Sequence, residues 1–448
     1  MQDIDKIIAL QKEYFQSQAT KSYLFRKKQL ETLYKAIFEN TEKIEEALYQ
    51  DLGKPAFEAY STEIGFVLNS ITYTLKHLKR WMKPKKHIPP VFLFGSYDTV
   101  TYVPYGISLI IGPFNYPFQL VIEPLIGAIA AGNTCIVKPS ENTPHTANLL
   151  AKLLQENFEE RYITCINGDK EVTIALTHSP IQHIFFTGSI PVGKSIMKAA
   201  GDRLIPVTLE LGGKSPVVID ETADVEDAAK KIVWGKALNA GQTCIAPDYL
   251  IIHESQKEAF IDAWSVYASM FKEHMAKIVN LHHFERLIQP LSTSIIYSGG
   301  AYDKVHLQIE LTLVDGNKSA YMEEEIFGPI LPMLTYRDFS EIVPKIEKHP
   351  NPLAFYIFSK DPQHIHDLQC RIAFGGGCVN DTINHLISHK VPFGGVGTSG
   401  IGQYHGKDSF ITFSHKQTIH HRFLKKDIVS LYPPYSKKLY QLVKKIMR

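Results

Sequence analysis

Cysteine is scarce in this sequence and follows no pattern that suggests pairing or metal binding. Only five cysteines occur among 448 residues, at positions 135, 165, 244, 370 and 378. Their number is odd, they are widely spaced, and no C-x-x-C pair or zinc-type Cys/His spacing is present. We therefore expect no disulfide framework and no metal site, and a reducing, cytoplasmic compartment fits best.

An excess of one charge and a long apolar run are also missing. Lys and Arg number 48 against 46 Asp and Glu, a net charge of +2, which excludes the basic surplus of a nucleic-acid-binding protein. The most apolar run, residues 120–137, is broken by Glu123, Pro124 and Asn133, so it predicts a buried helix and strand instead of a membrane span. We expect no signal peptide, because no apolar stretch follows a basic start.

The spacing of apolar residues predicts an α/β protein with more than one domain. The first 82 residues carry two apolar stripes at helical spacing, and residues 83–90, KPKKHIPP, are typical of a linker. From residue 97 short apolar strands alternate with helices, which indicates a parallel sheet covered on both faces. A second region of this kind begins near residue 211, and ligands are expected at the carboxyl ends of the strands.

The loop at 188–195, GSIPVGKS, matches the phosphate-loop pattern G-x-x-x-x-G-K-[ST]. An ATPase of the P-loop type, with Asp220 holding a metal, is therefore one interpretation. Pro191 argues against it, because proline lacks the N–H donor that a phosphate cradle uses. A helix N-terminus after a glycine turn binds the pyrophosphate of a dinucleotide equally well.

Three residues have both a structural and a chemical interpretation. Cys244, in GQTCIAPDY, is either a buried thiol or a nucleophile. Glu210 ends a predicted strand beside two glycines, either as a solvated turn residue or as a base that activates water. Asn115 follows another strand and either caps its own backbone or aims its amide at a developing oxyanion.

Other candidate side chains are expected to be structural. The adjacent histidines at 282–283 and 420–421 lack metal partners, so we expect them at the surface. We expect the other four cysteines in the core, because their surroundings are apolar or rich in glycine; these are Cys135, Cys165, Cys370 and Cys378.

Seven motifs, taken in order, resemble those of the aldehyde dehydrogenases, and within that family its class 3-like branch. They are PFNYPF, KPSE, FFTGS, LELGGKSP, NAGQTCIAPDY, EEIFGPILP and PFGGVGTSGIGQYHGKDSF. The resemblance runs from about residue 20 to residue 420, and CIAPDY and YHGKDSF point to the branch. The ordered set is far more specific than the phosphate-loop pattern, so it outweighs the ATPase interpretation.

The resemblance implies that an aldehyde is oxidised to the carboxylic acid with NAD or NADP. Cys244 matches the family's nucleophile, which forms a thiohemiacetal and then a thioester, and we expect local dipoles to lower its pKa. Glu210 matches the general base, and Asn115 the oxyanion donor. Relatives that pass the acyl group to coenzyme A typically lack this glutamate, so hydrolysis is expected. The cofactor positions match Lys138 and Glu141 at the adenosine ribose, Gly188, Ser189 and Gly193 at the pyrophosphate, and Glu325 and Phe327 at the nicotinamide ribose.

The resemblance also implies a domain plan and a homodimer. The expected parts are N-terminal helices with a dinucleotide-binding domain (residues 1–84 and 104–210), a catalytic domain (211–394), bridging segments to a partner (85–103 and 409–425) and a basic tail (426–448). Class 3-like enzymes take medium- or long-chain aliphatic or aromatic aldehydes. The alternative of a non-enzymatic structural descendant is disfavoured, because such a protein would be expected to lose Cys244 or Glu210.

The end of the chain, residues 435–448, has one apolar face and five basic residues without an acid. The spacing of Leu439, Leu442, Val443 and Ile446 predicts a short helix. Two interpretations stay open. The helix is either solvated or packed on protein, or it is a peripheral anchor with lysines on anionic lipid head groups.

Overall fold

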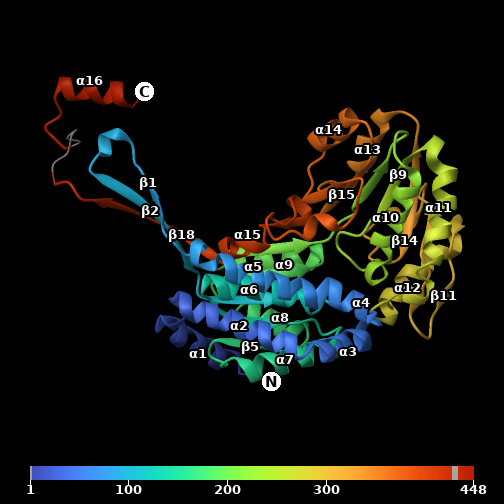
Figure 1. Cartoon of the computed structure of the whole chain (residues 1–448), viewed down its shortest axis with the longest axis horizontal. Coiled ribbons are helices and arrows are strands. Elements are labelled where there is room, and N and C mark those ends of the chain that lie inside the picture. The colour runs from blue at the N-terminus through green and yellow to red at the C-terminus, as the bar shows by residue number, and fades with distance from the viewer. Residues whose placement is uncertain (1–2, 426–431, 448) are drawn as a thin grey trace.

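The computed structural model describes residues 3–425 and 432–447. Figure 1 shows two bodies and an arm that leaves the first body. The first body holds the N-terminal helices and a six-stranded sheet, and the second holds a seven-stranded sheet. No helix in these described ranges is long and apolar enough to cross a membrane.

The N-terminal region is helical, as its periodicity predicts. Its apolar stripes turn inward, and Leu30, Leu33, Ile37 and Ile71 are fully buried. The main helices are α1 (Ile4–Gln16), α2 (Tyr23–Glu39), α3 (Thr41–Leu52) and α5 (Gly65–Trp81).

The six-stranded sheet has the order β17-β7-β6-β3-β4-β5. Its strands are β3 (Ile107–Ile111), β4 (Thr134–Lys138), β5 (Ile163–Cys165), β6 (His183–Gly188), β7 (Val207–Leu211) and β17 (Gly400–Ile401). Only β17, at the edge, runs antiparallel to its neighbour. Ile110 packs toward one layer of helices, and Leu109 and Ile111 pack toward the other. These layers include α6 (Gln119–Ala131) and α7 (Pro144–Asn157) on one face, and α8 (Lys170–Thr177) and α9 (Ile190–Gly201) on the other.

The seven-stranded sheet has the order β10-β13-β14-β9-β8-β15-β16, with only β10 antiparallel. The strands are β8 (Pro216–Ile219), β9 (Tyr249–His253), β10 (Ile296–Ser298), β13 (Thr312–Asp315), β14 (Ile330–Tyr336), β15 (Ala354–Phe358) and β16 (Gly376–Val379). Its helices are α10 (Val225–Ala237), α11 (Lys257–Ser269), α12 (Leu281–Ile288), α13 (Ile342–Ile346) and α14 (Pro362–Arg371). The predicted α/β fold with parallel sheets is confirmed, and the antiparallel edge strands are an addition to it.

The last part of the chain returns to the first body and then enters the arm. Helix α15 (Gly406–Thr412) packs on α6, where a Cβ on Gly127 would lie 2.8 Å from the Ser409 Cβ. The arm pairs β1 (Lys85–His87), β2 (Ser96–Pro104) and β18 (Ser414–Arg422) in an antiparallel sheet. Residues 85–87, within the stretch typical of a linker, form a strand by backbone hydrogen bonding to β2, in the segment 85–103 for which the resemblance implies a bridge.

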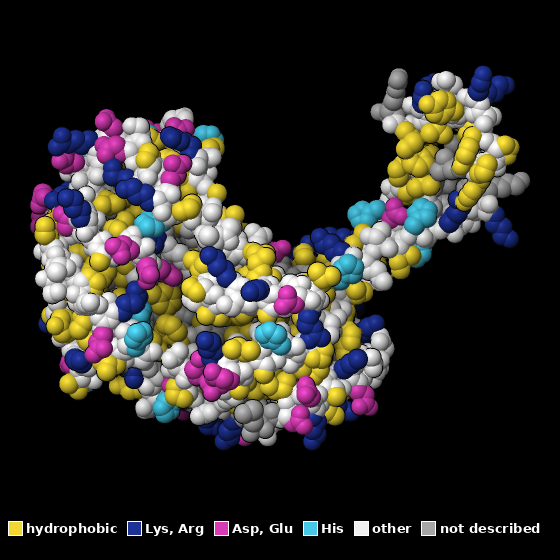
Figure 2. All heavy atoms as spheres, turned by 180° about the vertical axis from the view of Figure 1, so that it is seen from behind, with side chains coloured by type: hydrophobic (Ala, Val, Ile, Leu, Met, Phe, Trp, Pro, Cys, Tyr) yellow, Lys and Arg dark blue, Asp and Glu magenta, His cyan; other side chains and the backbone are white. Residues whose placement is uncertain are grey.

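The end of the arm carries exposed apolar side chains and the tail helix. Ile88, Val91, Phe94 and Phe423 are 97%, 81%, 62% and 66% exposed, and Figure 2 shows apolar side chains gathered there. Helix α16 (Lys437–Ile446) lies beyond the strands in Figure 1. It lies within the segment for which a helix is expected, and the Ser436 side chain caps its start by accepting a hydrogen bond from the Leu439 N–H.

Candidate active site

Cys244 follows a turn of three consecutive residues with left-handed backbone angles, 239–241. The φ angle is +50° at Asn239 and +71° at Gly241. A Cβ on Gly241 would lie 2.2 Å from the Gly328 carbonyl oxygen, so glycine is needed for this close approach. The turn is thereby pressed against the loop at 325–329, which carries two of the predicted cofactor residues.

The electrostatic surroundings of the Cys244 thiol oppose its ionisation. Burial raises its pKa to about 12, and the negative charges of Glu325 and Glu210 act in the same direction. The backbone N–H groups of Cys244 and Ile245 act the other way and do not outweigh them. The expectation that local dipoles lower the Cys244 pKa is therefore wrong.

Glu210 lies within β7, paired with Thr187 of β6 and Gly400 of β17. Both carboxyl oxygens are buried, and neither has a hydrogen-bond partner among the described residues. Burial raises the Glu210 pKa well above its usual range. A buried carboxyl group without a partner is rare in folded proteins, and it marks a place where a ligand or a water molecule binds.

Asn115 lies in the loop between β3 and α6 and is 2% exposed. Its backbone carbonyl accepts hydrogen bonds from Asn239 Nδ2 at 2.7 Å and from Lys54 Nζ at 3.3 Å. Within the described ranges no hydrogen bond engages its side-chain amide. The backbone of Asn115 is thus fixed while its amide stays available to a ligand.

A buried ion pair supports the Asn115 loop from behind. Lys54 and Glu63 are fully buried and pair with each other, and the Glu63 carboxylate also accepts from the N–H groups of Phe118, at 2.9 Å, and Gln119, at 3.1 Å. The Lys54 ammonium lies 4.1 Å from the ring centroid of Tyr116. The sequence did not point to this pair, because the fold brings it to the site from distant helices and no motif marks it.

The residues predicted to bind the adenosine ribose and the pyrophosphate lie at the carboxyl ends of β4 and β6. Lys138 ends β4, is buried, and places its Nζ 2.7 Å from the carboxylate of the half-exposed Glu141. Gly188 ends β6, and Ser189 is the N-cap residue of α9, with no side-chain capping bond. A Cβ on Gly193 would lie 2.6 Å from a Leu211 methyl carbon, so this glycine sets the helix close to the sheet. A helix N-terminus left open in this way suits a phosphate group.

The predicted nicotinamide-ribose residues lie in the loop next to the nucleophile turn. A Cβ on Gly212 would meet the Glu325 carboxylate at 2.1 Å, so the glycine makes room for this side chain. Burial raises the Glu325 pKa to about 8. Phe327 has a φ of +52°, unusual for a bulky residue, and its ring packs on that of Phe114 with centroids 5.6 Å apart.

Helix α12 holds this strained loop in place. His283 Nε2 is 2.8 Å from the Phe327 carbonyl oxygen, and Arg286 donates to the Ile326 carbonyl oxygen. Burial lowers the His283 pKa to about 4, so the ring is neutral and donates from Nε2. The expectation of a surface role is wrong for His283. Adjacent histidines in the sequence gave no indication that one of them would turn inward.

The structure meets some of the remaining expectations and contradicts others. Cys135 and Cys165 are buried as expected, whereas Cys370, on α14, is exposed and Cys378, on the edge strand β16, is only partly buried. Lys194 is exposed on α9, while Asp220 follows β8 in the other sheet, bonded to Ser359, Thr222 and His364. The ATPase interpretation therefore lacks its metal-holding acid.

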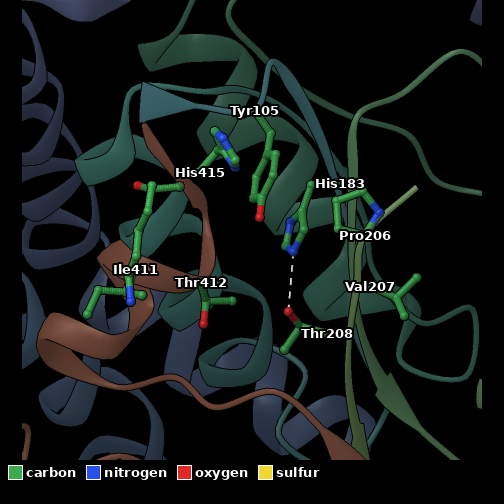
Figure 3. Close-up of a pocket in the computed structure, with 10 residues that line it drawn as sticks. Tyr105, His183, Pro206, Val207, Thr208, Ile411, Thr412 and His415 are labelled. Carbon is green, nitrogen blue, oxygen red and sulfur yellow. Dashed lines mark hydrogen bonds between the residues drawn. The ribbon is translucent and has the colours of Figure 1, made fainter. Parts of the chain in front are cut away.

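Figure 3 shows a cavity of about 370 Å³ near the base of the arm. Tyr105, His183 and Thr208 line it, and His183 Nε2 lies 3.2 Å from the Thr208 hydroxyl. The lining includes none of the predicted catalytic or cofactor residues. The candidate active site is therefore the cluster around Cys244 and not this cavity.

Comparisons with known proteins agree with the geometry. The model of the aldehyde dehydrogenase family matches residues 1–419. The chain is 48% identical over 438 residues to the 4,4'-diaponeurosporen-aldehyde dehydrogenase of Staphylococcus aureus, covering 95% of each. It is 41% identical over 441 residues to aldehyde dehydrogenase family 3 member A2 of Pongo abelii, covering 95% of this chain and 90% of that one.

A solved structure, the substrate-bound state of Staphylococcus aureus AldH, matches at a TM-score of 0.97 and 46% identity, covering 100% of both chains. The family match spans nearly the whole chain, and the identity to these relatives is high enough to indicate a shared family and not only a shared fold. This chain belongs to the aldehyde dehydrogenase family, and it is an enzyme that oxidises aldehydes with NAD or NADP.

Proposed function

We propose that this enzyme converts an apolar aldehyde into its carboxylic acid through a covalent intermediate on Cys244, with Glu210 activating the hydrolytic water. The observation that carries this proposal is the pair of buried Glu210 carboxyl oxygens without a partner in the described ranges. Leaving such a group unsatisfied costs about 1–3 kcal/mol or more. A water molecule held between Glu210 and an acyl group on Cys244 would satisfy it.

The first step is attack of the Cys244 thiolate, formed when the thiol proton passes to solvent, on the aldehyde carbon. An aldehyde has no leaving group, so hydride departs only after a nucleophile has made the carbon tetrahedral. The developing oxyanion accepts hydrogen bonds from the free amide of Asn115 and from the Cys244 N–H. Each such donor contributes about 3 kcal/mol to the transition state.

The second half of the reaction is hydrolysis. The nicotinamide supplies the hydride acceptor, and loss of hydride leaves a thioester on Cys244. Glu210, as the carboxylate, takes a proton from water while the water oxygen attacks the thioester carbon; the C–S bond breaks and the acid leaves. A raised pKa makes Glu210 a stronger base, and its active form appears as the pH rises through that pKa.

The arrangement of side chains fits a dinucleotide. Lys138 and Glu141 would hold the adenosine ribose, Gly188, Ser189 and Gly193 the pyrophosphate, and Glu325 and Phe327 the nicotinamide ribose. The Glu325 carboxylate in the space left by Gly212 supports this assignment, because it can accept from ribose hydroxyls. Glu141 favours NAD for the same reason, although its exposure leaves room for a 2′-phosphate.

We infer a homodimer bridged by segments 85–103 and 409–425, as the domain plan anticipates. Support comes from the exposed apolar side chains on the arm, including Ile88, Val91 and Phe423. A second protomer would remove this surface from water. The five free cysteines support a cytoplasmic location, because thiols persist in reducing compartments.

The tail helix α16 is proposed to rest on an anionic membrane surface. On its apolar face Leu442 is 45% exposed and Leu439 and Val443 are partly exposed, and lysines precede and follow these residues. An apolar strip between lysines is typical of peripheral anchors. A membrane contact suits a long, poorly soluble aldehyde, and the relative from Staphylococcus aureus is named for a diaponeurosporen aldehyde. The other interpretation, a solvated helix, stays open.

The substrate class is tested with a panel of short aliphatic, long-chain aliphatic and aromatic aldehydes, each with NAD and with NADP. We expect kcat/KM to rise with apolar size and the free acid to be the product. Rates that depend on added coenzyme A, with an acyl-coenzyme A product, would contradict the hydrolytic role of Glu210.

A further inference from the structure

Asn239 lies fully buried between the two loops that carry Asn115 and Cys244. Its single side-chain amide donates to the Asn115 carbonyl oxygen at 2.7 Å and to the Gln242 carbonyl oxygen at 3.1 Å. One of these acceptors belongs to the residue with the free amide, and the other lies just before the nucleophile. The same –NH₂ group therefore joins both halves of the site.

The position of Asn239 is itself fixed from several sides. Its N–H donates to Glu58 Oε1 at 2.7 Å, and its carbonyl oxygen accepts from the Gln242 backbone N–H and side-chain amide, both at 3.0 Å. The left-handed φ of +50° suits asparagine better than most residues. The Asn239 amide oxygen is buried without a partner in the described ranges, so the residue is held by its bonded N–H, carbonyl oxygen and Nδ2.

The Asn115 side chain depends on this support. No hydrogen bond holds its amide within the described residues, so its direction follows from its backbone. That backbone is held at its carbonyl by two donors, Asn239 Nδ2 and Lys54 Nζ. The Asn239 bond is the shorter, and it alone extends to the Cys244 turn.

We propose that Asn239 is a positioning residue, which sets the separation between the oxyanion donor Asn115 and the nucleophile Cys244. This inference rests on the roles proposed above for those two residues. Loss of the Asn239 amide would let the two loops move independently. The reaction up to hydride transfer would slow, whereas cofactor binding, which uses other loops, would not change.

The first test compares Asn239→Ala with the matched control Asn133→Ala. Asn133 is also fully buried and donates its amide to backbone carbonyls, of Phe413 at 2.9 Å and Ala128 at 3.4 Å, but away from the site. The measurement is the rate constant of the NADH burst per folded active site, together with the cofactor Kd. We expect Asn239→Ala to slow the burst about 10- to 100-fold at unchanged cofactor Kd. The control should lower Tm and leave the burst within twofold.

The second test uses Asn239→Asp, which keeps the size of the side chain. A protonated aspartic acid can donate one hydrogen bond, to one of the two carbonyl oxygens, and an ionised one can donate none. Burial and the nearby Glu58 and Glu63 oppose ionisation, while Lys54 favours it. We expect the ratio of variant to wild-type burst rate to fall as pH rises, a change that a merely structural role would not produce.

The outcomes separate this inference from the function on which it rests. A burst within twofold of wild type in Asn239→Ala, or a flat pH ratio in Asn239→Asp, would overturn the inference, and so would failure of both variants to fold. If Cys244→Ala and Asn115→Ala lose activity while Asn239→Ala keeps it, only the inference fails. If Cys244→Ala keeps activity, the proposed function itself fails.

Discussion

The active site and the arm expose opposite kinds of unsatisfied surface. In the site, polar groups are buried without partners: both Glu210 oxygens lack one within the described ranges. On the arm, large apolar side chains stand in water, with Ile88 almost fully exposed. In each region a binding partner would lower the free energy, because it would supply hydrogen bonds to the buried polar groups or remove the apolar patch from water.

The two kinds of surface indicate different kinds of binding partner. A buried cluster with free hydrogen-bonding atoms fits a reacting aldehyde, water and the cofactor. In the proposal above, the projecting sheet with apolar ends takes a second protein chain, and its basic tail a lipid surface. The two regions should therefore respond separately to mutation, and substitutions or deletions in each region test this separation.

The largest effect is expected for Cys244→Ala. Without Sγ no thiohemiacetal forms, so dehydrogenase activity should fall at least about 1,000-fold while cofactor binding and oligomeric state persist. Steady-state kinetics and cofactor titration measure this. Cys378→Ala is the matched control, because this partly buried thiol has no proposed role. Activity above a tenth of wild type in Cys244→Ala would show that catalysis does not need the covalent step.

Asn115→Ala should lower kcat about 100-fold, because it removes one oxyanion donor worth about 3 kcal/mol. The effect should appear in the NADH burst rate, measured by stopped flow, with little change in cofactor affinity. Asn115→Asp should be at least as slow, since a carboxylate repels an oxyanion. A normal burst in either variant would remove Asn115 from the chemistry.

Changes on the arm should act on assembly instead of chemistry. Ile88→Ser or Phe423→Ser removes an apolar side chain whose burial is worth about 1.5–3 kcal/mol, so dimer dissociation should rise about 10-fold or more per substitution. Analytical ultracentrifugation measures the dissociation constant. Val305→Ser is the control, since Val305 is 86% exposed on the second body. Equal behaviour of all three variants would refute a dimer bridged by the arm.

The smallest effect on catalysis is expected for removal of residues 436–448. Activity on small soluble aldehydes should stay within twofold. Binding to vesicles with anionic lipids should weaken and lose its salt dependence, because each lysine near the surface contributes about 1 kcal/mol. Vesicle co-sedimentation at low and high salt distinguishes the alternatives. Equally weak binding of full-length and truncated chains would make α16 a solvated or protein-packed helix.

The sequence singles out the candidate site residues but not the scaffold that supports them. Cys244 and Asn115 follow a glycine- or proline-containing turn, and Glu210 precedes one, and such turns leave a readable pattern. Lys54 and Glu63 do not, because they reach the site only when the N-terminal helices pack under the Asn115 loop. The expected lowering of the Cys244 pKa was wrong for a related reason. Burial and the charges of Glu325 and Glu210 raise this pKa, and both arise from tertiary contacts that the local sequence does not show.

The same limit explains the errors elsewhere. Adjacent histidines look alike in sequence, yet only His283 contacts the loop that carries Phe327. The strand β1 lies within a stretch with prolines and lysines that is typical of a linker, and it exists because β2 offers it a partner. Short continuous apolar runs were sufficient for the parallel sheets, whose strands are buried on both faces, and helical periodicity was sufficient for α16.

Glu210 is proposed to act on water after hydride transfer, and the Glu210→Gln variant tests this role directly. The variant keeps the size of the side chain and removes the base. Rapid mixing with aldehyde and NAD should give an NADH burst of normal amplitude, slow turnover without the wild-type rise of kcat with pH, and an acyl adduct on Cys244 by mass spectrometry. Loss of the burst, or turnover at the wild-type rate, would contradict the account.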